Sequence, residues 1–272
     1  MVDWCLTYID PTNPIGISKS RHEGRLAGRG CIGEKQITPD SDDFERAHFL
    51  VLKHTAEVDP YIEEHMEMLR QQNPDRSEAW IARAHMSGFN IWFRDRLQNS
   101  SSCKDNRLRQ LAKGPFFTVT TYQGYDINGY TFYTIEQDKK SVYQNYAVRV
   151  DAFDNNMQKG TYYGQIEEIW ELSYPGFKMP IFRCRWVQGR QGIMKDRYGY
   201  TTVDLEQVGY MEEPFVLASQ VSQVFYVHDT RNKKRQVVPL GKSGLLEFKI
   251  KLMRKSSMNL VNSLLLIVPS SL

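Results

Sequence analysis

The spacing of apolar residues divides the chain into a helical part and a strand-rich part. Within residues 41–98, apolar side chains recur every three or four positions, which is the period of amphipathic helices. Three runs each follow a helix-start signal: a capping box at Asp42, a proline directly after Asp59, and a capping serine at Ser77. We therefore expect three helices joined by short connectors.

The third expected helix has the widest apolar stripe. The stripe consists of Ile81, His85, Phe89, Trp92 and Phe93. Three-helix bundles are one architecture that binds DNA, but a stripe of this width must pack against a neighbouring element. We interpret it as part of a hydrophobic core.

After a Ser- and Asn-rich link at residues 99–106, the period changes to that of strands. Asn128 and Gly129 lie between two aromatic runs, and this dipeptide favours a turn in which both φ angles are positive. Residues 125–132 are therefore predicted to form a β-hairpin. A strand is expected to close at residues 138–140, and residues 142–153 are predicted to form a further extended run.

The strongest strand signals lie between residues 161 and 227. Phe182, Cys184 and Trp186 alternate with two arginines, which predicts a half-buried strand. In residues 165–172 the alternation is incomplete, so the two faces of that strand are only partly segregated. Short strands joined by tight turns favour a small, strongly bent barrel or sandwich.

These patterns together predict an α+β protein: a helical N-terminal part followed by an antiparallel β-rich part with a small barrel or sandwich. The expected parts are a basic, glycine-rich and poorly ordered segment (1–40), a helical region (41–98), a β-hairpin region (115–153), a small β-barrel-like domain (161–240) and a basic tail of doubtful structure (241–272).

Composition narrows the class of protein. The net charge of +3 is too small to identify a partner. The four cysteines are widely spaced and form no C-x-x-C pair, which argues against a disulfide framework or a zinc knuckle. The first residues do not resemble a signal peptide, and the longest apolar run is far shorter than the ~20 residues that span a bilayer. We expect a soluble intracellular protein, nuclear or cytoplasmic, with no membrane partner and no cofactor.

Basic residues gather near both ends of the chain and on one predicted strand face. Gly28, Gly30 and Gly33 match the spacing of a dinucleotide-binding fingerprint, but the strand and helix that this motif requires are not predicted around them. The basic side chains are instead candidates for phosphate contacts. The candidate nucleic-acid-binding residues are Lys19, Arg21, Arg25, Arg29, Arg183, Arg185, Arg231, Lys233, Lys234 and Arg235.

Aromatic residues of the β-rich part are candidates for a second kind of contact. Tyr163, Trp170, Tyr174 and Trp186 could form a stacking platform or cage for a base or a peptide. The alternative is that the two tryptophans are the core of a small sheet.

No arrangement of residues indicates an enzyme. A two-metal nuclease needs three carboxylates that hold two metal ions about 4 Å apart. Glu167 and Glu168 are adjacent, and neighbouring side chains of a regular strand point to opposite faces, so they are not expected to share an ion. His65, which follows Glu64, is interpreted as a packing residue. We assign no catalytic and no metal-binding residue.

Six short blocks carry a family resemblance. They are Ser20-Arg21-His22-Glu23-Gly24-Arg25-Leu26, Arg46-Ala47-His48-Phe49, Tyr61-Ile62-Glu63-Glu64-His65, Tyr122-x-Gly124-Tyr125-x-Ile127-Asn128-Gly129-Tyr130, Tyr162-Tyr163-Gly164-x-Ile166-Glu167-Glu168-Ile169-Trp170-Glu171-Leu172 and Phe215-x-Leu217-Ala218-Ser219-Gln220. In this order they resemble the reading frames of plant CACTA (En/Spm-type) DNA transposons. The last two resemble the transposase-associated C-terminal domain of unknown function in those frames.

The resemblance implies that the chain is the C-terminal piece of a transposon protein, from a truncated element or a fragmentary gene prediction. In such elements a ribonuclease-H-like catalytic region lies upstream, and no block of this chain matches it. The family offers no agreed catalytic or binding residues, so none is carried over. The tail after Pro239 departs from the family pattern and is consistent with read-through of non-coding sequence.

We therefore expect a non-catalytic accessory fragment of a transposon-derived protein that binds DNA or a partner protein, such as the transposase. Two alternatives stay open. One is a degenerate fragment of a metal-dependent transposase or nuclease. The other is a protein–protein assembly module whose edge strands pair with another protein.

Overall fold

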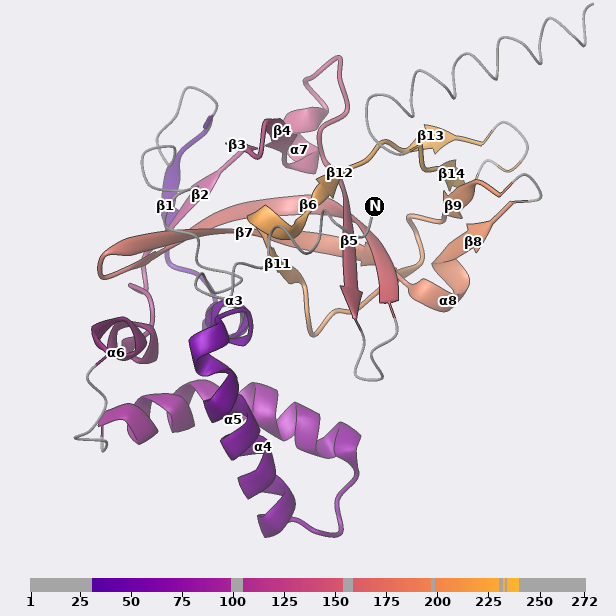
Figure 1. Ribbon diagram of the computed structural model, residues 1–272. Helices are drawn as coiled ribbons and strands as arrows, with labels where there is room; N and C mark the ends of the chain where they lie inside the picture. Colours follow the sequence, from indigo (N-terminus) through magenta and orange to yellow (C-terminus); the bar gives the residue numbers. More distant parts are fainter. Residues whose placement is uncertain are drawn as a thin grey trace, which may run out of the picture.

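The computed structural model describes residues 31–98, 105–153, 159–196, 199–229, 232 and 234–239. Helices occupy its N-terminal part and antiparallel sheets follow, which confirms the predicted α+β class (Figure 1). Most of the expected basic segment at 1–40 and the expected tail at 241–272 lie outside the described residues.

Within the described residues, no strand interrupts the series of helices from α3 to α6. They are α3 (Ser41–Lys53), the 3-10 turn η1 (Ala56–Val58), α4 (Asp59–Gln72), α5 (Glu78–Gln98) and α6 (Asn106–Lys113). α4 and α5 begin where their start signals predicted, and the Ser77 hydroxyl accepts a hydrogen bond from the Trp80 amide at 3.3 Å.

The predicted cap of the first helix is wrong by two residues. Asp40, not Asp42, caps α3: its carboxylate accepts hydrogen bonds from the backbone amides of Asp42 (2.9 Å) and Asp43 (3.4 Å). Asp42 is itself helical, so its amide is one of the donors that a cap must satisfy.

The β-rich part is built around two long strands, β6 (Lys159–Tyr174) and β7 (Phe177–Val187), which form a hairpin (Figure 1). The other edge of β6 pairs with β2 (Val119–Tyr122) and with β5 (Ala147–Phe153). The sheet is completed by β1 (Lys35–Ile37) on β2, β12 (Ser222–Gln223) on β5, and β10 (Val208–Gly209) and β11 (Phe215–Leu217) on β7. Within the described residues this is an eight-stranded sheet, and it crosses the predicted boundary at residue 161.

Two smaller sheets flank it. The hairpin of β3 (Gly124–Ile127) and β4 (Tyr130–Tyr133) confirms the predicted turn, with positive φ angles of 55° at Asn128 and 79° at Gly129. The second small sheet pairs β13 (Val227–His228), β14 (Gln236–Val237), β9 (Thr201–Val203) and β8 (Ile193–Lys195), and β8 follows the short helix α8 (Gly189–Gly192).

The expected strand end near Asp138 is wrong. Asp138 belongs to the one-turn helix α7 (Ile135–Asp138), which Thr134 caps by accepting a hydrogen bond from the Gln137 amide. The Asp138 carboxylate accepts a hydrogen bond from the Asn145 amide at 2.7 Å, and this fixes the chain before β5.

The two faces of the large sheet bury different clusters. One face packs against α3, α5 and α6, and its strand residues include Trp170, Leu172 and Ile181. The opposite face packs against the β3–β4 hairpin, with Ile166, Ile169 and Phe182 among its strand residues. Figure 1 shows the helices below this sheet and the hairpin above it. A third cluster lies between the sheet and the second small sheet.

Candidate functional site

A β-bulge interrupts the central hairpin. Ile166 pairs with Cys184 and Glu168 pairs with Arg183, so the register shifts at Glu167, which is the extra residue on β6. Because of this shift, Ile166 and Ile169 both point into the hairpin-side cluster although they are three residues apart. The bulge therefore explains why the alternation in residues 165–172 is incomplete.

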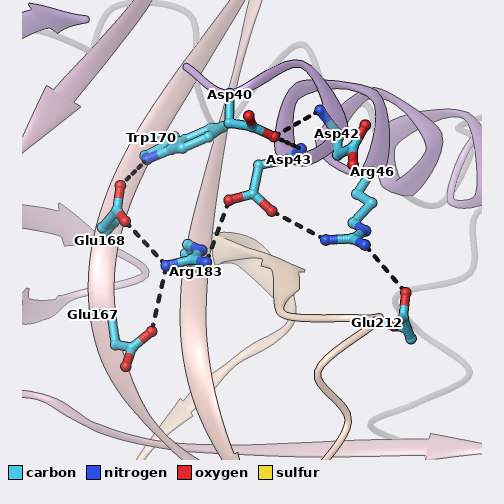
Figure 2. A network of polar contacts seen from close by, with 9 residues as sticks. All are labelled: Asp40, Asp42, Asp43, Arg46, Glu167, Glu168, Trp170, Arg183 and Glu212. Atoms are coloured by element: carbon cyan, nitrogen blue, oxygen red, sulfur yellow. Dashed lines mark hydrogen bonds and ion pairs between the residues drawn. The ribbon is translucent and has the colours of Figure 1, made fainter.

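The bulge brings both glutamates to one guanidinium (Figure 2). Nη1 of Arg183 lies 3.2 Å from Oε1 of Glu168 and 3.6 Å from Oε2 of Glu167. The expectation that these two side chains point to opposite faces of the strand is therefore wrong. Strict alternation holds only for a regular strand, and an inserted residue changes the direction of the side chains around it.

A third carboxylate reaches the same arginine from the helical layer. Nη2 of Arg183 lies 3.3 Å from Oδ2 of Asp43 on α3. Asp43 also contacts Arg46, and Arg46 Nη2 lies 3.1 Å from Oε2 of Glu212 on the loop between β10 and β11. We call Asp43, Arg46, Glu167, Glu168, Arg183 and Glu212 the acid–arginine network (Figure 2).

The network is anchored in the core on one side. The Trp170 indole N–H donates to Oε2 of Glu168 at 2.7 Å, and the Trp170 ring is buried against Phe215. The Arg183 side chain is 30% exposed, and its buried Nε has no hydrogen-bond partner among the described residues. Because three carboxylates contact Arg183, this arginine links α3 to the sheet and is not free to bind a phosphate.

No group of three or more His, Cys, Asp or Glu side chains in the described ranges could hold a metal ion. The guanidinium of Arg183 contacts the three carboxylates of Asp43, Glu167 and Glu168. The network therefore supplies charge-assisted hydrogen bonds between layers.

Two other candidate arginines also have partners within the chain. Arg185 Nη2 donates to Oε1 of Gln165 at 2.8 Å. Arg235 donates to the backbone oxygens of Gly192 (2.9 Å) and Thr202 (3.2 Å), so it joins β14, β9 and the end of α8. Lys234 is exposed. The remaining candidates, Lys19, Arg21, Arg25, Arg29, Arg231 and Lys233, lie outside the described residues.

The expected aromatic platform is not formed. Tyr163, Trp170, Tyr174 and Trp186 are all buried. Trp170 and Tyr174 belong to the helix-side cluster, Trp186 to the hairpin-side cluster and Tyr163 to the third cluster. Both faces of the sheet are covered, so aromatic residues on either face enter a core.

A carboxylate outside the network is fully buried. Glu171 has no exposed surface, and its Oε1 lies 2.6 Å from Nζ of Lys178 on the neighbouring strand. Burial, and next the charge of Glu171, raise the pKa of the Tyr122 and Tyr125 phenols well above the usual range. The lysine compensates for the cost of burying this charge.

The helical layer contains buried histidines with polar partners. Nδ1 of His48 lies 3.0 Å from the Tyr174 hydroxyl, and Nδ1 of His65 lies 2.8 Å from Nδ1 of His85, so one ring of this pair donates and the other accepts. Burial lowers the pKa of His48 to about 3 and that of His85 to about 4. His65 packs against Trp92, so it is a packing residue as expected.

Charge is distributed unevenly between the described residues and the rest of the chain. The described residues contain 27 of the 32 Asp and Glu residues but 22 of the 35 Lys and Arg residues. Residues 40–98 alone contain twelve acidic and seven basic residues. The helical layer is therefore acidic, and such a surface repels the phosphates of DNA.

The backbone conformation of one surface residue, Tyr210, follows from no pattern in the sequence. Tyr210 has a φ angle of 57°, and within the described ranges only Asn128 is a second non-glycine residue with positive φ. No sequence pattern predicts a tyrosine in this conformation.

Asp43, Arg46 and Glu212 were also not predicted as site residues, because the tertiary fold brings them to their partners.

Comparison with known proteins identifies one domain. Residues 170–238 match a domain of unknown function (DUF4216). This segment runs from the second half of β6 to the end of the second small sheet, so it contains Arg183 and Tyr210. No curated protein and no solved structure matches the chain. Among the described residues, no helix has both the length and the apolar character needed to cross a bilayer.

Proposed function

We propose that this chain is a non-catalytic accessory module of a transposon-derived protein and that its described part binds another protein. One observation carries the choice of a protein over DNA: three candidate phosphate-binding arginines, Arg183, Arg185 and Arg235, are held by oxygens of the chain itself. An engaged guanidinium would have to break these contacts to reach a phosphate. The transposon origin rests on the six sequence blocks that resemble CACTA reading frames.

The experiment is selection of a random-peptide display library on the full chain. A protein-binding module should enrich peptides that share a motif, and a synthetic peptide with that motif should bind the chain in solution. Repeated selections that converge on no motif would argue against protein binding.

DNA binding by other residues is a second candidate. Thirteen Lys and Arg residues lie outside the described ranges, against five Asp and Glu residues, and six of the ten candidate nucleic-acid contacts are among them. Binding of the full chain to duplex DNA should then weaken steeply between about 50 and 200 mM salt. Replacing Lys19, Arg21, Arg25 and Arg29 with glutamine should reduce it, whereas Arg183→Gln should act only through stability.

The nuclease alternative can be tested at the acid–arginine network. Arg183→Met would leave Asp43, Glu167 and Glu168 gathered without their cation. Nicking of plasmid DNA in magnesium or manganese by the unaltered chain, abolished in Glu167→Ala, would overturn the non-catalytic proposal. Nicking by the Arg183→Met variant alone would indicate a degenerate metal site that the arginine has neutralised.

A further inference from the structure

Tyr210 is held in an unfavourable backbone conformation. A φ angle of 57° places it in the left-handed region, which a bulky side chain rarely adopts. The amide of Glu213 donates to the Tyr210 carbonyl at 3.0 Å, so Tyr210 begins a tight turn between β10 and β11. A strained residue persists only where the surrounding structure holds it, and such residues cluster at functional sites.

Tyr162 and Gly189 lie close to the Tyr210 ring. The Tyr210 ring meets the ring of Tyr162 edge-on, with centroids 5.2 Å apart. A Cβ added at Gly189 would lie 2.8 Å from the Tyr210 hydroxyl, so the ring passes close to the backbone there. One added at Gly209 would lie 3.1 Å from Gln188. Tyr162 and the backbone at Gly189 therefore restrict the position of the Tyr210 ring in the absence of a partner.

The ring lies in an exposed apolar surface. Tyr210 is 44% exposed, Met211 is 71% exposed and Val208 is 37% exposed. Tyr162 is partly buried and packs against the hairpin-side cluster, so the surface is continuous with the core. A rigid aromatic ring that is already ordered is the kind of residue that contributes most to protein interfaces.

The chain segment that carries this surface is acidic. Residues 199–229 contain five Asp and Glu residues and no Lys or Arg. Glu212 and Glu213 pair with Arg46 and Lys53 of α3, yet their side chains remain 73% and 66% exposed. An apolar surface with an acidic rim complements a partner that carries both apolar and basic side chains, and it repels nucleic acid.

We propose that Val208, Tyr210 and Met211, with Tyr162 behind them, form a docking surface for a basic segment of a partner protein that also carries apolar side chains. Tyr210 is the anchor, and the acidic composition of residues 199–229 favours a basic partner. This inference rests on the proposed protein-binding function and gives it a place on the molecule.

The experiment measures binding of two labelled peptides to the full chain by fluorescence anisotropy. One peptide alternates lysine and leucine, and the other has glutamate in place of each lysine. The lysine peptide should bind and the glutamate peptide should not. Tyr210→Gly should weaken binding by at least about tenfold, as expected for an interface anchor, and glycine should tolerate the positive φ angle without loss of fold.

A matched control is Tyr143→Ala, because Tyr143 is 78% exposed and lies on the loop before β5. This variant should bind like the unaltered chain. Equal binding of the two peptides, or full binding by Tyr210→Gly, would overturn the proposed surface. Duplex DNA that binds the unaltered chain and is lost in Tyr210→Gly would overturn the choice of a protein partner there.

Failure of this surface and failure of the proposed function have different signatures. A peptide selected by display that binds Tyr210→Gly as tightly as the unaltered chain places the protein-binding site elsewhere. Absence of any selected peptide counts against protein binding as such. Circular dichroism of the Tyr210→Gly variant distinguishes loss of the anchor from loss of the fold.

Discussion

Nη1 of Arg183 on β7 lies 3.2 Å from Oε1 of Glu168 on β6. The register of these two paired strands shifts at Glu167, the residue before Glu168. The same nitrogen reaches Glu167, and the other terminal nitrogen reaches Asp43 on α3. One guanidinium therefore joins a bulged strand to the helical layer, and the loop that carries Tyr210 is joined to the same helix through Arg46 and Glu212.

Removal of the Arg183 charge should destabilise the chain. In Arg183→Met three carboxylates lose their shared cation, and since the site is partly exposed we expect a loss of about 2 kcal/mol in the free energy of unfolding. Urea denaturation followed by tryptophan fluorescence measures it. Arg70→Met is the control, because Arg70 pairs with Glu78 on the open surface and such pairs contribute little. Equal effects of the two substitutions would contradict the importance of the network.

Stability should fall on acidification. The folded-state pKa values of His48 and His85 are lowered to about 3 and about 4, whereas unfolded histidine titrates near 6.5. Below pH 6.5 the unfolded chain takes up protons that the folded chain does not. The free energy of unfolding should therefore decrease as pH falls from 6.5 towards 4, by on the order of 1–2 kcal/mol per histidine at pH 5.

The measurement is the urea midpoint as a function of pH. His85→Asn removes one of these histidine titrations and should make the profile less steep, even if it lowers stability at pH 7. A profile that stays equally steep in this variant would assign the acid sensitivity to groups other than His85.

Gly164 should not tolerate a side chain. A Cβ at this position would lie 2.7 Å from Cε3 of Trp186 and 3.3 Å from the Arg185 carbonyl oxygen, so the tryptophan would have to move within a packed cluster. Gly164→Ala is expected to cost about 2 kcal/mol or more through overpacking. Thermal unfolding measures it.

The matched glycine is Gly129. It has a φ angle of 79° and open space around it, and asparagine tolerates the left-handed region. Gly129→Asn should therefore have a much smaller effect than Gly164→Ala. The reverse order would show that the packing around Trp186 is loose.

Two adjacent basic residues should behave differently. Arg235 donates to backbone oxygens of Gly192 and Thr202, so Arg235→Gln should destabilise the second small sheet by about 1–2 kcal/mol. Lys234 is exposed, and Lys234→Gln should leave stability unchanged. Protection of the β9 and β14 amides in hydrogen exchange reports on this sheet directly. Equal protection in both variants would contradict the structural role of Arg235.

Local signals in the sequence were sufficient for several elements. The Asn128-Gly129 turn, the proline after Asp59 and the Ser77 cap each act over a few residues, so the hairpin and two helix starts could be predicted without knowing the fold. The incomplete alternation before Trp170 coincides with the bulge at Glu167.

The candidate sites were decided by contacts between distant segments. Arg183 was expected to face solvent because its strand alternates, but α3 covers that face and supplies Asp43. The four aromatic residues were platform candidates until layers on both faces of the sheet buried them.

The sequence alone therefore determined the α+β class, two helix starts, the β3–β4 hairpin and the charge of each region, because these depend on neighbours along the chain. The tertiary structure decided which arginines are held by oxygens of the chain, which aromatic rings are buried and which side chain Glu167 and Glu168 share. Those outcomes depend on which face is covered and on a one-residue shift between paired strands. The left-handed conformation of Tyr210 is also an outcome of the tertiary structure, because Tyr162 and Gly189 lie close to the Tyr210 ring.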